Sequence, residues 1–135
     1  MKQHKIRFQQ AFAYLYYLML SADNVADIKE LKLGKKIINI EKLDYQDVMN
    51  QMDQLTKVPR NQIFSEAVDL IKGIAKKEQV KCLAYIQLIA KIDGSYDERE
   101  KELLDQISIS ELNISLQEIS DVEKELNKVI AKIDS

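Results

Sequence analysis

The side chains of this sequence that could do chemistry are mainly carboxylates, and they recur in one short pattern. An apolar run ends in an aspartate, and the next segment opens on Asp-x-x-Glu. The pattern occurs first at Asp23 with residues 27–30, and again at Asp93 with residues 97–100. Carboxylates at such a corner could bind a cation, transfer protons or cap a helix. Both corners must therefore be positioned by the helices on either side of them.

The same offset of seventy positions joins further residues, which predicts two copies of one helical unit. The matching pairs are Leu18/Leu88, Asp23/Asp93, Asp27/Asp97, Glu30/Glu100, Leu33/Leu103 and Ile37/Ile107. Segment 43–48 reappears as 114–119, offset by one extra residue. A chain of 135 residues suits one compact domain. We expect the two repeats to pack face to face around one core.

Apolar side chains at three- and four-residue steps predict an all-α domain of about seven helices. The helices are expected over about 5–22, 27–38, from the N-cap Asp44 onward, from the N-cap Asn61 to 77, 80–92, 97–107 and 115–133. Pro59 disfavours helix at the residue before it. The single domain thus divides into repeat one (about 5–57), a linker (58–61), a bridging helix (about 61–77) and repeat two (about 78–133).

The apolar helix, the Asp93-Gly94 corner and the Asp-x-x-Glu that follows resemble the tellurite-resistance TerB-like family. Members of that family have an all-helical fold with two related halves. The resemblance covers essentially the whole chain in helix order, although its specific motif is short. Two positions depart from the family pattern, because Asn24 replaces the corner glycine and Ile92 replaces the alanine before the aspartate. The resemblance implies a non-enzymatic, cytoplasmic module of the stress-response type.

The resemblance also implies a divalent cation, such as Ca²⁺, Mg²⁺ or Mn²⁺, held by clustered acidic residues. Carried over by position, the ligands would be Asp23, Glu30, Asp93 and Glu100, with Asp27 and Asp97 as weaker additions. Hard cations take several oxygen ligands, which four carboxylates from two corners could supply. The alternative is ordinary helix capping, with the neighbouring Lys29 and Arg99 neutralising the acids.

Charge is distributed unevenly along the chain. Residues 1–36 carry seven Lys or Arg against three Asp or Glu, whereas residues 93–135 carry five against twelve. An acidic half attracts basic partners and repels a phosphate backbone, so nucleic acid is disfavoured as a partner. A second hypothesis is therefore a metal-independent scaffold that docks an unidentified protein through the surface of residues 98–105. No apolar run reaches the roughly 18 residues of a membrane span, and the expected location is the cytoplasm.

Two groups of lysines are candidates for contact with an anionic surface. Lys29, Lys32 and Lys36 share one face of the second predicted helix. A second group consists of Lys72, Lys76 and Lys77, with Lys81 nearby. Either group could dock an acidic partner, an anionic ligand or an anionic membrane at its periphery. The simpler interpretation is a solvated helix face.

Residues for catalysis are sparse. His4 is the single histidine and lies near the start of the chain, and Cys82 lies in an apolar pattern typical of a packing residue. Tyr14 and Tyr17 share a helix face that is expected to pack rather than to stack bases. The sequence contains no glycine-rich phosphate loop and no nucleophile motif. We therefore expect neither an enzyme nor an organic cofactor, and an undetected hydrolase would have to depend on the same carboxylates.

Overall fold

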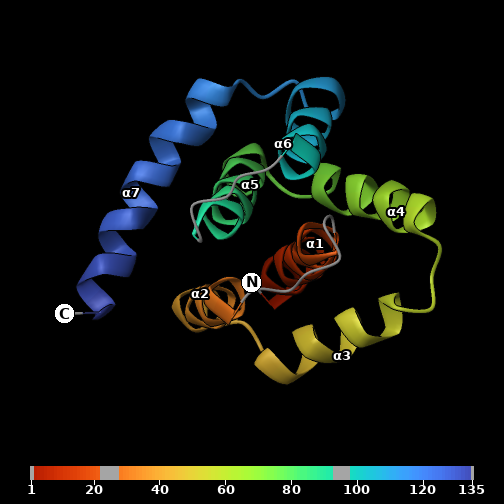
Figure 1. Ribbon diagram of the computed structural model, residues 1–135, viewed down its shortest axis with the longest axis horizontal. Helices are drawn as coiled ribbons and strands as arrows, with labels where there is room; N and C mark the ends of the chain where they lie inside the picture. Colours follow the sequence, from red (N-terminus) through yellow and green to blue (C-terminus); the bar gives the residue numbers. More distant parts are fainter. Residues whose placement is uncertain (1, 22–27, 93–97, 135) are drawn as a thin grey trace.

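The computed structural model describes residues 2–21, 28–92 and 98–134, and within these ranges every regular element is helical (Figure 1). The elements are α1 (Lys2–Leu20), α2 (Ile28–Ile40), α3 (Tyr45–Leu55), α4 (Arg60–Lys72), α5 (Lys76–Lys91), α6 (Glu98–Asp105), the π-helical turn η1 (Gln106–Glu111) and α7 (Leu116–Asp134). The prediction of an all-α chain is confirmed. Among the described residues, no helix has the length and apolar character needed to cross a membrane.

Helices α1 and α5 form the centre of the fold, and the other helices surround them (Figure 1). α5 is buried on every side, because residues 82–90 are all buried. A helix that is apolar around its whole circumference belongs in a core. α1 packs against α3, α4 and α5, whereas α5 also contacts α2, α6 and α7. The two central helices therefore position the segments that carry the acidic corners.

A close contact between α1 and α2 depends on a glycine. A Cβ atom at Gly34 would overlap the phenol ring and hydroxyl of Tyr16. Tyr16 is buried, and its hydroxyl donates a hydrogen bond to the backbone carbonyl of Glu30 at 3.1 Å. The absence of a side chain at Gly34 thus lets the two helices approach closely enough for this bond.

The starts of the later helices follow the offsets seen in the sequence. α3 and α7 begin 71 positions apart, at Tyr45 and Leu116, and α2 and α6 are described from Ile28 and Glu98. The only described non-glycine residues with positive φ, Lys42 (57°) and Asn113 (56°), are also 71 positions apart. The offset between the two halves thus grows from 70 to 71 between α6 and α7. The π-helical turn η1 lies in this interval, and a π-helical turn accommodates one additional residue within a helix.

Two predicted helix starts are confirmed by their caps. Asp44 accepts a hydrogen bond from the backbone N–H of Asp47 at 3.0 Å and caps α3. Ser115 precedes α7 and exchanges hydrogen bonds with Glu118, which is the reciprocal arrangement of a capping box.

The predicted boundaries around α4 were wrong. α4 begins at Arg60 with Pro59 at the N-cap, so Asn61 is not the cap, and no side chain bonds there. Proline at this position sacrifices no hydrogen bond. The bridging helix also ends at Lys72 instead of continuing to 77, and α5 begins at Lys76 instead of 80. The break is stabilised by the side chain of Gln79, whose amide donates to the carbonyls of Ile71 and Ile74.

Candidate functional site

Two of the predicted metal ligands, Glu30 and Glu100, lie in the first turns of α2 and α6. Each is the third residue of its helix, and each is almost completely buried, with exposed fractions of 3% and 2%. Burying a carboxylate costs free energy unless hydrogen bonds, an opposite charge or a metal ion compensates it. The two glutamates are the most deeply buried acidic residues that the structure describes.

The four predicted aspartate ligands, Asp23, Asp27, Asp93 and Asp97, lie outside the described residues. Within residues 2–21, 28–92 and 98–134, no group of three His, Cys, Asp or Glu side chains is arranged to hold a metal ion. The structure therefore places only the glutamate of each corner.

Tyr16 links the core to the first of these glutamates. Its hydroxyl holds the Glu30 carbonyl, as described above. Burial raises the pKa of the Tyr16 phenol, and the nearby charges of Glu30 and Tyr45 raise it further. The phenol therefore stays protonated and acts as a hydrogen-bond donor that fixes the first turn of α2 on α1.

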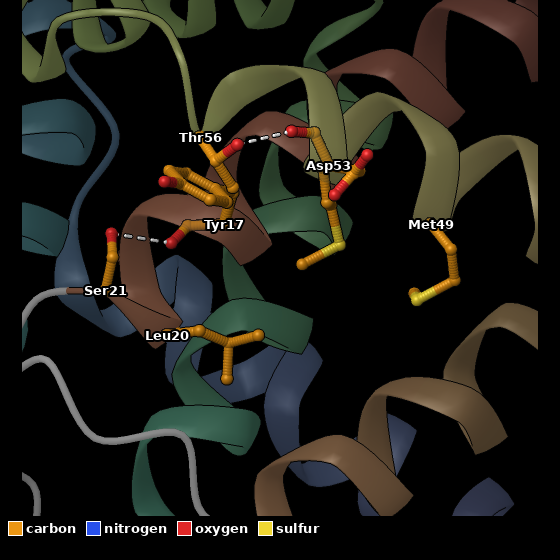
Figure 2. A pocket seen from close by; sticks show the side chains of 7 residues that line it. Tyr17, Leu20, Ser21, Met49, Asp53 and Thr56 are labelled. Carbon is orange, nitrogen blue, oxygen red and sulfur yellow. Dashed lines mark hydrogen bonds between the residues drawn. The ribbon is translucent and has the colours of Figure 1, made fainter.

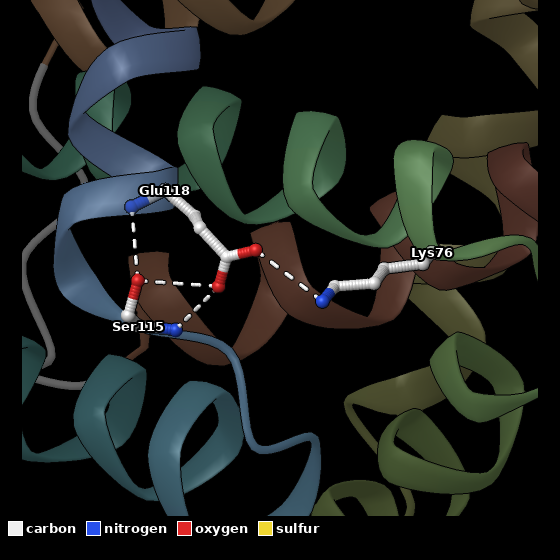
Figure 3. A network of polar contacts seen from close by, with 3 residues as sticks. All are labelled: Lys76, Ser115 and Glu118. Atoms are coloured by element: carbon white, nitrogen blue, oxygen red, sulfur yellow. Dashed lines mark hydrogen bonds and ion pairs between the residues drawn. The ribbon is translucent and has the colours of Figure 1, made fainter.

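Glu118 shows what ordinary capping looks like at the same helical position (Figure 3). It is the third residue of α7, and its carboxylate accepts a hydrogen bond from the backbone N–H of Ser115 at 2.9 Å. That bond and the neighbouring Lys76 ammonium hold the pKa of the Glu118 carboxyl below its ordinary value. The Glu118 side chain remains 42% exposed. Capping by itself therefore does not require the burial seen at Glu30 and Glu100.

Lys72 of α4 and Lys76 and Lys91 of α5 are paired with acids of the same chain. Lys72 lies 3.5 Å from Glu111 of η1, and Lys76 lies 3.3 Å from Glu118 of α7. On the adjoining face, the amide of Gln87 and the ammonium of Lys91 reach the carboxylate of Glu123, at 3.0 and 3.5 Å. Part of the acidic excess of the C-terminal half thus helps to seat η1 and α7 on the core, which reduces the acidic surface left for a partner.

Lys81 belongs to a more enclosed network around Glu41. The Lys81 ammonium lies 2.9 Å from the Glu41 carboxylate, and the Tyr85 hydroxyl donates to the same carboxylate. Desolvation lowers the pKa of Lys81, but its hydrogen bond to Glu41 and the charges of Glu41 and Glu78 raise it above the ordinary value overall. The network therefore keeps Lys81 charged and joins the end of α2 to α5.

Cys82 follows Lys81 and is fully buried, as its apolar context predicted. Burial raises the pKa of its thiol, and the charges of Glu78 and Glu41 act in the same direction. A thiol held in the protonated form is a poor nucleophile. Cys82 is therefore a packing residue of α5.

The lysines of α2 have different surroundings. Lys29, Lys32 and Lys36 line a groove of about 390 Å³, as their shared helix face suggested. The other lining residues are apolar and come from three helical segments: Leu33 of α2, Ile92 at the end of α5, and Ile130 of α7. The sequence contained the lysine spacing, but it held no local signal for this floor because the contributing segments are far apart along the chain.

A second concave surface lies between α1 and α3 and has a volume of about 470 Å³ (Figure 2). Leu20, Met49 and Met52 contribute apolar surface, and Tyr17 lies at one end. The hydroxyls of Ser21 and Thr56 donate to carbonyls of their own helices, Tyr17 and Asp53. Because those donors are already used, this surface offers mainly hydrophobic contact.

Comparison with protein-family models, with curated proteins and with solved structures finds no match to this chain.

Proposed function

We propose that this chain is a non-enzymatic binding module of the TerB-like type, which holds a divalent cation at the corners that precede α2 and α6. The observation that carries the proposal is the burial of Glu30 and Glu100, which are 3% and 2% exposed. In this proposal Asp23 and Asp93 complete the oxygen ligands, and Asp27 and Asp97 are weaker additions. Ca²⁺, Mg²⁺ and Mn²⁺ are the cations that suit such a set.

The comparison with Glu118 supports a role beyond capping. All three glutamates occupy the third position of a helix, yet Glu118 performs its capping while 42% exposed. Glu30 and Glu100 are much more deeply buried, and burying a carboxylate carries a desolvation cost. A bound cation would offset that cost, because its charge favours the ionised carboxylate.

The two related halves of the proposed TerB-like architecture are supported by paired features of the backbone. α3 and α7 begin 71 positions apart, and the positive-φ residues Lys42 and Asn113 share that offset. The two buried glutamates, Glu30 and Glu100, are seventy positions apart. In a molecule of this kind, cation binding stabilises the first turn of two outer helices against the central pair. A cytoplasmic stress-response role is what the resemblance adds to this proposal.

The test is thermal unfolding of chelator-stripped protein with added Ca²⁺, Mg²⁺ or Mn²⁺. A ligand that prefers the folded state raises the midpoint in a saturable manner. We expect such a rise in the native chain and its loss in Glu30→Gln and Glu100→Gln. Glu118→Gln is the matched control, since it removes a carboxylate from the same helical position without touching either corner.

Absence of a shift with every metal at millimolar concentration would refute the proposal. An undiminished shift in both Gln variants would refute the assigned ligands. Because Glu30 and Glu100 are buried, their variants are first checked for native circular dichroism. If either fails to fold, Asp23→Asn and Asp93→Asn test the same corners, and retention of the full metal response in both would count against the site.

A further inference from the structure

The last two turns of α7 carry an apolar stripe that the fold leaves partly uncovered. α7 has 19 residues, whereas α3, which begins 71 positions earlier, has 11. The extension bears Val129, Ile130 and Ile133, at spacings that place them along one side of the helix. Val129 and Ile133 are 43% and 56% exposed, while Ile130 is buried in the lysine-lined groove. The stripe therefore continues outward from the floor of the groove.

The groove is lined by three lysines and by apolar residues, among them Ile130 of this stripe. α2 supplies Lys29, Lys32 and Lys36, and the end of α5 supplies Ile92, which is 42% exposed. Figure 1 shows α2, the end of α5 and the C-terminal half of α7 on the same side of the fold. Half of the lining residues are lysines and the other half are apolar. The surface thus combines positive charge with an apolar floor.

We propose that this groove binds an acidic amphipathic helix of a partner protein. The apolar face of that helix lies on Leu33, Ile92 and Ile130, and a carboxylate on its flank faces the exposed Lys32. An amphipathic helix seated in a hydrophobic groove is a common mode of peptide recognition. The opposite charges set the orientation of the bound helix and speed its association. The aliphatic stems of the lysines add apolar contact along the rim.

The shape of the surface favours a helix over a lipid bilayer. The exposed Val129 and Ile133 could contact either a helix or a bilayer, but Ile130 and Leu33 lie in a recess and are 9% and 6% exposed, out of reach of a flat headgroup layer. A partner helix can fill such a recess with its own side chains. The inference does not rest on the proposed cation, because it depends on the lysines, the end of α5 and the extension of α7.

The test uses the full chain and a fluorescent synthetic helical peptide with leucines at i, i+3, i+4 and i+7 and glutamates on both flanks. A twin peptide carries lysines in place of the glutamates. Fluorescence anisotropy is expected to show saturable binding of the acidic peptide, weakening with added salt, and much weaker binding of its twin. Lys32→Glu should reduce affinity at least about tenfold, since repulsion replaces attraction.

Ile133→Ser should also weaken binding by removing apolar contact. Two matched controls should leave affinity unchanged: Lys77→Glu, an exposed lysine of α5, and Ile109→Ser, an exposed isoleucine of η1. All four side chains are exposed, so the variants are expected to keep the native fold. Circular dichroism checks that expectation before binding is measured.

Three results would overturn the proposal. The first is absent saturable binding, or equal affinity for the two peptides. The second is an equal loss of binding in the groove variants and their controls. The third is assignment of the groove to another occupant: co-sedimentation with phosphatidylcholine–phosphatidylserine vesicles that Lys32→Glu abolishes, without peptide binding, would assign it to a membrane. Self-association that Ile133→Ser abolishes, again without peptide binding, would assign it to a second copy.

Discussion

The two lysine surfaces of this molecule have similar spacing along their helices but are placed against different segments of the chain. Lys72 and Lys76 each face an acid supplied by η1 or α7, and their charges are used within the chain. Lys29 and Lys32 of α2 line a groove whose other walls are apolar. The role of a row of lysines therefore depends on which segment, distant in the sequence, the fold places opposite it. Exposed ion pairs add little stability, so the first surface is mainly one of solubility and docking.

The largest change in stability is expected from Gly34→Ala, a substitution in α2 that leaves the surface of Lys72 and Lys76 untouched. The added methyl group would overlap Tyr16, and the change should lower the free energy of unfolding by about 1–3 kcal/mol, as for other overpacked sites. Urea unfolding followed by circular dichroism measures it.

Gly73→Ala is the control on the side of the paired lysines. There the nearest atom to the added methyl group would be the Leu70 carbonyl oxygen at 3.4 Å, and φ is −80°. This change should be neutral or should stabilise by roughly 0.4–1 kcal/mol, because alanine restricts the unfolded chain. Equal effects of the two substitutions would contradict the close packing assigned to Gly34.

A smaller loss is expected from Glu41→Gln, which weakens the link between the end of α2 and α5. The Lys81 and Tyr85 side chains would lose a charged acceptor, and the free energy of unfolding should fall by about 1–2 kcal/mol after some screening by solvent. Glu125→Gln is the control, because the Glu125–Lys128 pair is 74% and 72% exposed and should change stability little. Similar urea midpoints for the two variants would contradict a structural role for the Glu41 network.

The smallest effect is expected at Glu118, the partner of Lys76, and it should depend on pH. The pKa of its carboxyl is lower in the folded chain than its ordinary value of 4.5. Glu118 therefore contributes stability above pH 4.5, and the contribution disappears as the pH falls through the lower, folded-state pKa. Glu118→Gln should make stability slightly less sensitive to acid over that interval. Thermal unfolding at a series of pH values measures this, and an unchanged pH profile would contradict the assignment.

Local signals in the sequence were sufficient for much of the fold. Helical periodicity predicted an all-α chain, a capping pattern located Asp44, and the recurrence of segment 43–48 at 114–119 placed the last helix start at 115. The same patterns failed between α4 and α5. There an apolar run continues through Gly73, and the break depends on the side chain of Gln79 bonding to carbonyls five and eight residues earlier.

The candidate sites were less predictable, because they depend on burial and on distant segments. Asp-x-x-Glu and the Ser115–Glu118 pattern look alike in sequence, yet Glu30 is 3% exposed and the Glu118 side chain is 42% exposed. The lysines of α2 were visible as a shared face. Ile130, which completes their groove, lies about a hundred positions later and is brought there by tertiary packing.

Helix α2 presents different residues to the interior and to the groove. Glu30 is buried in its first turn, while Lys29 and Lys32 line the groove beside it. Tyr16 holds the Glu30 carbonyl in that same first turn, so the two proposed sites share one helical segment. If cation and peptide both bind, the factor by which the cation changes peptide affinity must equal the factor by which the peptide changes cation affinity. The two sites would then communicate through a single helix.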